Sequence, residues 1–136
     1  MFDEHLDMLV RKSAFNFLDV LTKTYGDVIP RKELERGFEF KGQRIHLIGP
    51  QGIFKPKVME LPLTITTSPD SRYDDAFSKD GFLTYRYRGD NINHRDNVGL
   101  RETCRHGLPL IYFHGTIPGA YVAHWPVFVV VDTPQE

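Results

Sequence analysis

The stretch between residues 73 and 88 concentrates aromatic and acidic side chains of the kinds that recognise a nucleic-acid base. Tyr73 is followed directly by Asp74 and Asp75, and Tyr85 comes twelve positions after Tyr73. Two aromatic rings that flank a slot can sandwich a flat base, and stacking is worth about 1–3 kcal/mol per base. Carboxylates supply acceptors for an exocyclic amine, which a cytosine edge presents. These residue types favour a base-binding pocket.

Basic and amide side chains continue the same stretch and suit contacts with phosphate and sugar. Arg86 and Arg88 alternate with Tyr85 and Tyr87, so an extended strand would show rings on one face and guanidinium groups on the other. The formal net charge is −1, so a DNA contact requires a local basic face rather than a general positive field. The alternative, that these arginines only form a solvated face, stays open. Further candidates for DNA contacts are Asn91, Asn97 and Arg101.

A loop over residues 51–56 combines an apolar tip with a cation and rigid flanks. Ile53 and Phe54 form the tip, and Lys55 and Pro56 follow them. An apolar side chain of this kind can fill the gap that a displaced base leaves in a duplex. We therefore predict that Phe54 and Lys55 contact DNA. The alternative is a turn in which both apolar residues belong to the core.

Catalytic and metal-binding patterns are weak in this sequence. It contains no His-Glu-x-x-His, Gly-x-Ser-x-Gly or Walker motif. Asp74 and Asp75 are adjacent on an extended segment, so their side chains point to opposite sides and share a metal poorly. We expect no catalytic residue, no metal and no cofactor, although a pocket built from histidines on separate elements stays an alternative. These histidines are His94, His106, His114 and His124.

The N-terminal third of the chain predicts helices followed by a hairpin. Apolar spacing predicts a helix over 3–25 that ends at Gly26, and a short second helix over 30–36 that ends at Gly37. Residues 38–48 predict a hairpin with a tight Lys-Gly turn. This order resembles part of a winged-helix unit; the alternative is a helical cap packed on a β-core.

The remainder of the chain predicts an α+β fold rich in strands. Strands are expected over 61–67, 82–88, 110–114 and 121–131, with one short helix over 97–105. The length of 136 residues suits one compact unit, and the 40% hydrophobic and 26% charged composition is ordinary for a soluble protein. The single cysteine excludes an intrachain disulfide and fits a reducing cytoplasm. The N-terminus has no signal-peptide pattern.

The residues from Tyr73 to Gly89 resemble the central motif of SRA domains, the SET- and RING-associated modules that flip 5-methylcytosine out of a duplex. The resemblance runs from about residue 47 to residue 132. Supporting matches are Gly52-Ile53-Phe54, Asn97-Val98-Gly99-Leu100, the stretch 109–115 and the stretch 118–131. The whole chain also resembles the N-terminal region of bacterial HNH endonucleases that cut modified DNA.

The resemblance implies an SRA/PUA-like curved β-barrel over residues 47–136, with residues 1–46 as an N-terminal helical extension packed on it. It implies that Tyr73 and Tyr85 stack on the flipped base, that Asp75 meets the base edge, and that Thr84 lies near the methyl pocket. The expected base pocket is Tyr73, Asp74, Asp75, Thr84, Tyr85 and Tyr87. The expected DNA contacts are Phe54, Lys55, Arg86, Arg88, Asn91, Asn97 and Arg101.

By the same resemblance the chain is a DNA-binding reader of modified cytosine in the bacterial cytoplasm, serving restriction of modified DNA. Its partner is a duplex that carries 5-methylcytosine or 5-hydroxymethylcytosine, and any nuclease activity belongs to a separate HNH domain. Ala76 stands where the best-known eukaryotic members have a third acidic residue, and the 89–97 loop is shorter than theirs. The modification that is read therefore stays open. The alternative function is a PUA-like module that binds RNA or unmodified DNA.

Overall fold

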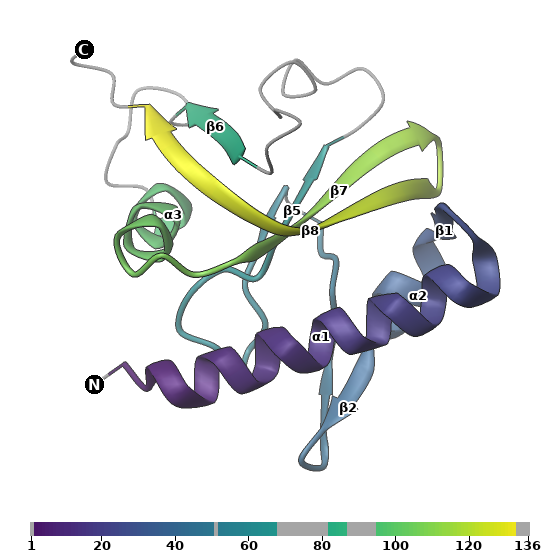
Figure 1. Cartoon of the computed structure of the whole chain (residues 1–136), viewed down its shortest axis with the longest axis horizontal. Helices are drawn as coiled ribbons and strands as arrows, with labels where there is room; N and C mark the ends of the chain where they lie inside the picture. The colour runs from purple at the N-terminus through teal and green to yellow at the C-terminus, as the bar shows by residue number, and fades with distance from the viewer. Residues whose placement is uncertain (1, 51, 68–81, 87–94, 133–136) are drawn as a thin grey trace.

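The structure, a computed structural model, describes residues 2–50, 52–67, 82–86 and 95–132, with only the backbone for 82–86, 95–97 and 130–132. A long N-terminal helix lies along one side of a mixed β-sheet (Figure 1). The helices are α1 (Glu4–Tyr25), α2 (Arg31–Arg36) and α3 (Arg95–Arg105). The strands are β1 (Val28–Pro30), β2 (Phe38–Phe40), β3 (Gln43–Ile45), β4 (Ile53–Phe54), β5 (Thr64–Thr67), β6 (Phe82–Arg86), β7 (Leu110–Ile117) and β8 (Ala120–Asp132).

Helix α1 confirms the predicted N-terminal helix. The Asp3 side chain accepts a hydrogen bond from the Leu6 amide and caps the first turn. Gly26 ends the helix with φ 80°, a conformation that favours glycine, and its amide donates to the Thr22 carbonyl. In the described part of the chain, no helix is long and apolar enough to cross a membrane. The helix buries one apolar stripe, formed by Val10, Ala14, Leu18 and Leu21.

The main sheet is open and mixed. Its strand order is β1-β8-β7-β5-β4, and β6 pairs with β8 outside this path. Strand β8 is antiparallel to β7, whereas β5 is parallel to β7 and β6 is parallel to β8. The α+β class is thus confirmed, but the described strands do not close into the expected barrel. The two strands at the ends of the path, β1 and β4, have only three and two residues and do not pair with each other.

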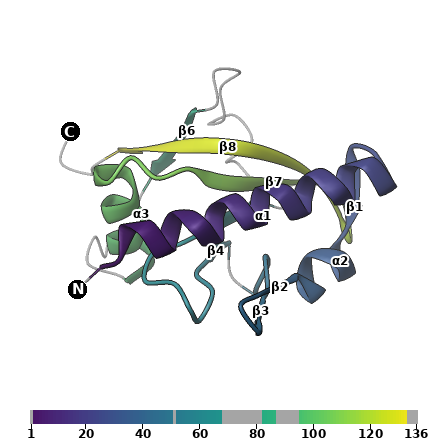
Figure 2. The ribbon, with the colours of Figure 1, turned by 60° about the horizontal axis from the view of Figure 1, so that its bottom comes forward.

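The two faces of the sheet pack against different helices. Ile111 and Phe113 of β7 join the cluster around α1, whereas Leu110 and Tyr112 join a second cluster that includes Leu100 of α3. This division follows the alternation of side chains along a strand. Figure 2 shows α1 lying across one side of the β7–β8 pair and α3 at the end of the sheet. We call the side away from α1 the outer face.

A β-bulge in β8 changes which of its residues reach the outer face. Leu110 pairs with Val127 but Tyr112 pairs with His124, so β8 contains one residue more than β7 across this interval. Before the bulge, Tyr121 belongs to the cluster around α1; after it, Val127 belongs to the cluster around α3. The bulge therefore moves the odd-numbered residues of β8 from the face that packs on α1 to the face that packs on α3.

The N-terminal region contributes a strand to the main sheet as well as covering it. Strand β1 pairs antiparallel with residues 120–122 of β8, and α1 shares a core with β7. The N-terminal region therefore shares both a sheet and a core with the later strands. The predicted hairpin is present with a turn at Lys41 and Gly42, both with positive φ. Its second strand ends at Ile45, because Leu47 turns away to donate its amide to the Leu34 carbonyl.

Candidate functional site

The predicted site residues are only partly covered by the structure. Thr84, Tyr85 and Arg86 lie on β6, and Asn97 lies on α3, with their backbone alone described. Phe54 and Lys55 lie at β4, and Arg101 lies on α3. The remaining predicted residues lie outside the described residues: Tyr73, Asp74, Asp75, Tyr87, Arg88 and Asn91.

Strand β6 aligns two predicted pocket residues with the C-terminal part of β8. Thr84 pairs with Val130 and Tyr85 with Val131 in a parallel register. Strand β8 also carries His124 further toward its N-terminus. The backbone at Thr84 and Tyr85 is therefore anchored to the same long strand that supplies His124 to the outer face.

The expected apolar loop tip is corrected by the structure. Ile53 is only 6% exposed, pairs with Ile65 and belongs to the core beside α3. The Phe54 ring is half-buried and lies so close to Gly49 that an added Cβ there would be 2.5 Å from it. Ile53 and Phe54 form an edge strand that pairs with β5, and this pairing places the Ile53 side chain in the core. Ile53 is thus core, as the alternative interpretation proposed.

Phe54 and Lys55 face a surface cleft that also reaches α3. The cleft has a volume of about 740 Å³ and includes Val98, Gly99 and Glu102 of α3 in its lining. The Lys55 ammonium donates to the Met59 carbonyl at 2.9 Å, so this cation holds its own loop together. The cleft brings two predicted DNA-contacting residues beside α3.

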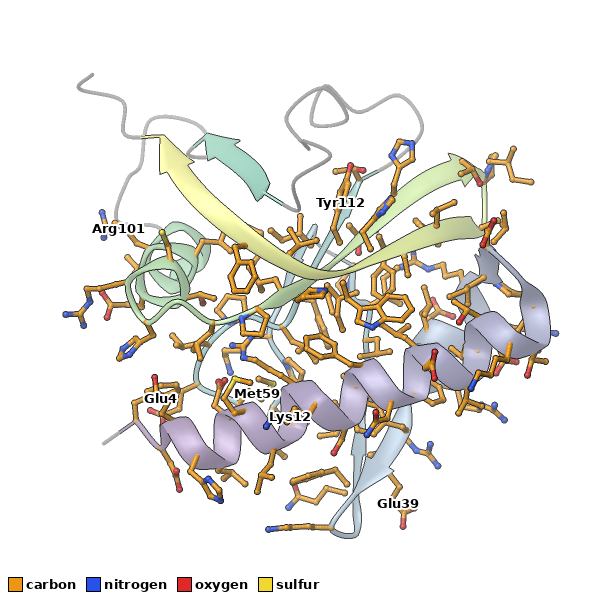
Figure 3. All side chains as sticks on the ribbon, viewed as in Figure 1. Glu4, Lys12, Glu39, Met59, Arg101 and Tyr112 are labelled. Carbon is orange, nitrogen blue, oxygen red and sulfur yellow. The ribbon has the colours of Figure 1, made fainter. Side chains whose placement is uncertain are left out.

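A polar cluster on the outer face brings together His114 and His124, two of the four histidines of the alternative interpretation, with Thr67 and Tyr112, which the sequence analysis did not single out. The Tyr112 hydroxyl lies 2.9 Å from Thr67 Oγ1 and 3.5 Å from His114 Nδ1. The Tyr112 ring stacks on His124, with centroids 5.7 Å apart and an interplanar angle of 23°. Figure 3 shows Tyr112 projecting from the sheet on the side away from α1. We call these four residues, Thr67, Tyr112, His114 and His124, the outer-face cluster.

The outer-face cluster lies where the sheet changes from buried to exposed. One row of directly paired residues runs from Thr67 on β5 through His114 and Val122 to Val28 on β1. Thr67 is 3% exposed and Val28 is 43% exposed, with the two central residues half-buried. Because directly paired residues lie on the same face of a sheet, the half-buried side chains of His114 and Val122 lie next to each other on the outer face.

The surroundings of His124 within the cluster favour the neutral form of its imidazole, because they lower its pKa. Burial lowers the pKa of His124, and the nearby His114 lowers it further by charge repulsion. A neutral imidazole has one donor and one acceptor nitrogen, so it can serve either role toward a ligand. In the described ranges, no group of three or more His, Cys, Asp and Glu side chains could hold a metal ion.

The sequence alone predicts only part of the outer-face cluster. Tyr112 and His114 are two positions apart on a strand, which places them on one face. His124 joins them only through the register that pairs it with Tyr112, and the bulge near residue 125 sets that register. The periodicity of the sequence does not give the register between β7 and β8. The proximity of His124 to Tyr112 and His114 could therefore not be predicted from the sequence.

Comparison with protein-family models, with curated proteins and with solved structures finds no match for this chain. The chemistry of the side chains and their placement on the sheet therefore carry the functional inference.

Proposed function

We propose that this chain is a DNA-binding module that recognises a modified cytosine by flipping it into an aromatic pocket. The pocket would consist of Tyr73 and Tyr85 as stacking rings and Asp75 as the acceptor for the base edge. The fold would be a member of the SRA/PUA type whose sheet is open rather than closed. The module would serve as the reader of a bacterial, cytoplasmic nuclease that cuts modified DNA, with the HNH nuclease in a separate domain.

The observation that carries this proposal is the outer-face cluster beside the end of β5. Thr67 is the last residue of β5 and belongs to the cluster, and the segment with Tyr73 and Asp75 follows it directly in the chain. The next described strand, β6, holds Tyr85 against β8. The proposal is supported by the described residues next to these segments: Thr67 ends β5, and β6 pairs with β8, which also carries His124 of the cluster.

The energies of base flipping are compatible with a pocket of this composition. Unstacking a base costs a few kcal/mol, and two aromatic stacks at about 1–3 kcal/mol each can offset that cost. Burying a methyl group adds only about 0.8 kcal/mol, which is roughly fourfold in affinity. Strong preference for a modified base therefore requires close fit and hydrogen bonds as well as burial.

The proposal is tested by measuring affinity for three duplexes of one sequence at fixed salt. They carry cytosine, 5-methylcytosine or 5-hydroxymethylcytosine at a single position, and fluorescence anisotropy gives each dissociation constant. We expect tighter binding to at least one modified duplex. Tyr73→Ala and Tyr85→Ala should each remove that preference while the protein stays folded. Tyr25→Ala is the matched control, because Tyr25 is an exposed tyrosine at the end of α1.

Two outcomes would contradict the proposal. Equal affinity for all three duplexes would exclude modified-base recognition, and tighter binding to RNA in the same assay would favour the PUA-like alternative. A preference that survives both tyrosine substitutions would exclude the proposed pocket. Incubation of a duplex with the protein and Mg²⁺ or Mn²⁺ tests the expectation that this chain is no enzyme, since clean cleavage would contradict it.

A further inference from the structure

We infer that the cleft beside β4 binds an extended, acidic peptide segment of another protein, which adds a strand to the open edge of β4. This inference goes beyond the proposed function and does not involve the base pocket. The cleft has a volume of about 740 Å³, which falls within the range of about 300–1,000 Å³ typical of ligand sites. Addition of a strand to a sheet edge is a common mode of peptide recognition.

Strand β4 is an end strand of the main sheet, and its hydrogen bonds to β5 leave its other edge open. The Thr66 amide donates to the Gly52 carbonyl at 2.7 Å, and the Leu63 amide donates to the Phe54 carbonyl at 3.0 Å. Backbone groups of successive residues in an antiparallel strand point to opposite edges, so the N–H and C=O of Ile53 point away from β5. Among the described residues these two groups have no hydrogen-bond partner.

The open backbone groups belong to a residue that is almost fully buried, since Ile53 is only 6% exposed. Buried backbone N–H and C=O groups are nearly always paired in proteins. A donor and an acceptor that are open side by side therefore indicate a partner that supplies both an acceptor and a donor. The backbone of an extended peptide does so, whereas a nucleic-acid phosphate only accepts hydrogen bonds.

The lining of the cleft places it along this open edge. Ile53 and Phe54 both line the cleft, although side chains of successive strand residues point to opposite faces of a sheet. A cavity that contacts both residues, and no described residue of β5, therefore lies beside the strand rather than over one face. Its other wall is the first part of α3, with Val98 and Gly99. At Gly99 the helix approaches the Pro62 ring so closely that an added Cβ would lie 3.0 Å from it, which bounds the cleft there.

Charged side chains around the cleft favour an acidic segment. On the α3 wall, Glu102 is paired with Arg105 at 2.5 Å, so this wall is neutral. The opposite wall carries the ammonium groups of Lys55 and Lys57 against the carboxylate of Glu60. One positive charge is in excess, and within the described part of the chain Lys57 has no ion-pair partner. An exposed pair with a peptide carboxylate raises affinity by about two- to fivefold.

The test uses two capped heptapeptides, one alternating valine with glutamate and one alternating valine with lysine, and follows the amide signals of the isotope-labelled full chain by NMR. In the free protein, the Ile53 amide should exchange with solvent at least about tenfold faster than the hydrogen-bonded Thr66 amide. With the glutamate peptide at about one hundred times its dissociation constant, exchange at Ile53 should slow by about a hundredfold. The lysine peptide should bind about two- to fivefold more weakly.

Modified peptides and protein variants test the backbone pairing and the place of the cleft. N-methylation of one alternate set of peptide amides should abolish binding, because it removes the donors that face β4, whereas methylation of the other set should not. Val98→Glu should weaken binding by about tenfold or more, because it replaces an apolar wall with a like charge. Val58→Glu is the matched control, since Val58 is an exposed valine of the same loop outside the cleft lining, and it should change affinity by less than about twofold.

Several results would overturn the inference. They are an Ile53 amide as protected as that of Thr66 in the free protein, no binding of the glutamate peptide at up to about 1 mM, and unchanged affinity in Val98→Glu. If Val98→Glu does not fold, the methylated peptides decide, because equal binding of both sets excludes pairing with β4. Protection of the Ile53 amide by duplex DNA but not by the peptide would assign the cleft to nucleic acid. Failure of modified-base recognition leaves these outcomes unaffected, because they are read at Ile53.

Discussion

The Asp7–Arg11 pair on α1 provides the sharpest prediction about stability. Arg11 is fully buried and Asp7 is 5% exposed, and the guanidinium Nε and Nη2 both donate to the Asp7 carboxylate. Its Nη1 donates to the Pro109 carbonyl at 2.8 Å. Pro109 directly precedes β7, the strand that carries Tyr112. The pair therefore fixes the helix to the start of a strand that builds the outer-face cluster.

Asp7→Ala should destabilise the fold strongly, because it leaves the Arg11 charge buried without its counter-ion. Breaking a buried pair in this way costs about 3–5 kcal/mol, a large part of the roughly 5–15 kcal/mol that stabilises a domain. Replacing both partners, as in Asp7→Leu with Arg11→Met, removes the unpaired charge. The Pro109 carbonyl then loses its donor at a cost of about 1–3 kcal/mol. The double variant should therefore be more stable than the single one by roughly 2 kcal/mol.

The measurement is the free energy of unfolding from urea titrations followed by circular dichroism. Asp19→Ala is the matched control, because Asp19 pairs with Lys23 at the same helical spacing on the exposed side of α1. That variant should change stability by less than about 0.5 kcal/mol. The reasoning is refuted if Asp7→Ala costs less than about 1 kcal/mol, or if the double variant is no more stable than Asp7→Ala.

Three further predictions concern glycine, the core and pH. Gly37→Ala should prevent folding or cost several kcal/mol, because its Cβ would lie 1.8 Å from the Ile45 carbonyl oxygen. Gly26→Ala has the same positive-φ strain but open space around the Cβ, so it should cost only about 1–3 kcal/mol in the same urea titrations. Ile53→Ala should cost about 2–4 kcal/mol, and a loss below about 0.5 kcal/mol would restore the exposed-loop interpretation. The pKa of His124 is lowered in the folded state, so the unfolded state binds the proton more readily and stability should fall as pH drops below about 6.5. His124→Gln should show a smaller loss of thermal stability between pH 7 and pH 5, and an unchanged loss would point to other groups.

Local signals predicted the helices and the hairpin well. Asp3 and Gly26 bound α1 by capping chemistry that involves only nearby residues. The Lys41-Gly42 turn was predicted because a tight hairpin needs positive φ at both central residues. These features depend on contacts within a few positions along the chain, and such contacts can be inferred from sequence.

Short strands were missed for a physical reason. Strand β1 has three residues and includes a proline, and β4 has two residues, so neither shows a periodic pattern. Each exists because a longer neighbouring strand offers its edge: β8 pairs with β1, and β5 pairs with β4. The prediction that Ile53 lies at the tip of an exposed loop was wrong for the same reason, because its place in the core depends on the pairing of β4 with β5.

Residue types and their spacing were enough to establish the α+β class, the helix ends, the turn of the hairpin and the group of Tyr, Asp and Arg residues that motivates the proposed pocket. The open form of the described sheet and the core position of Ile53 became evident from the strand pairings. The tertiary structure alone joined Tyr112, His114 and His124, because strand register and the β8 bulge bring them to one face. Register is set by contacts between residues far apart in the chain, and a single sequence records residue types without recording those pairings.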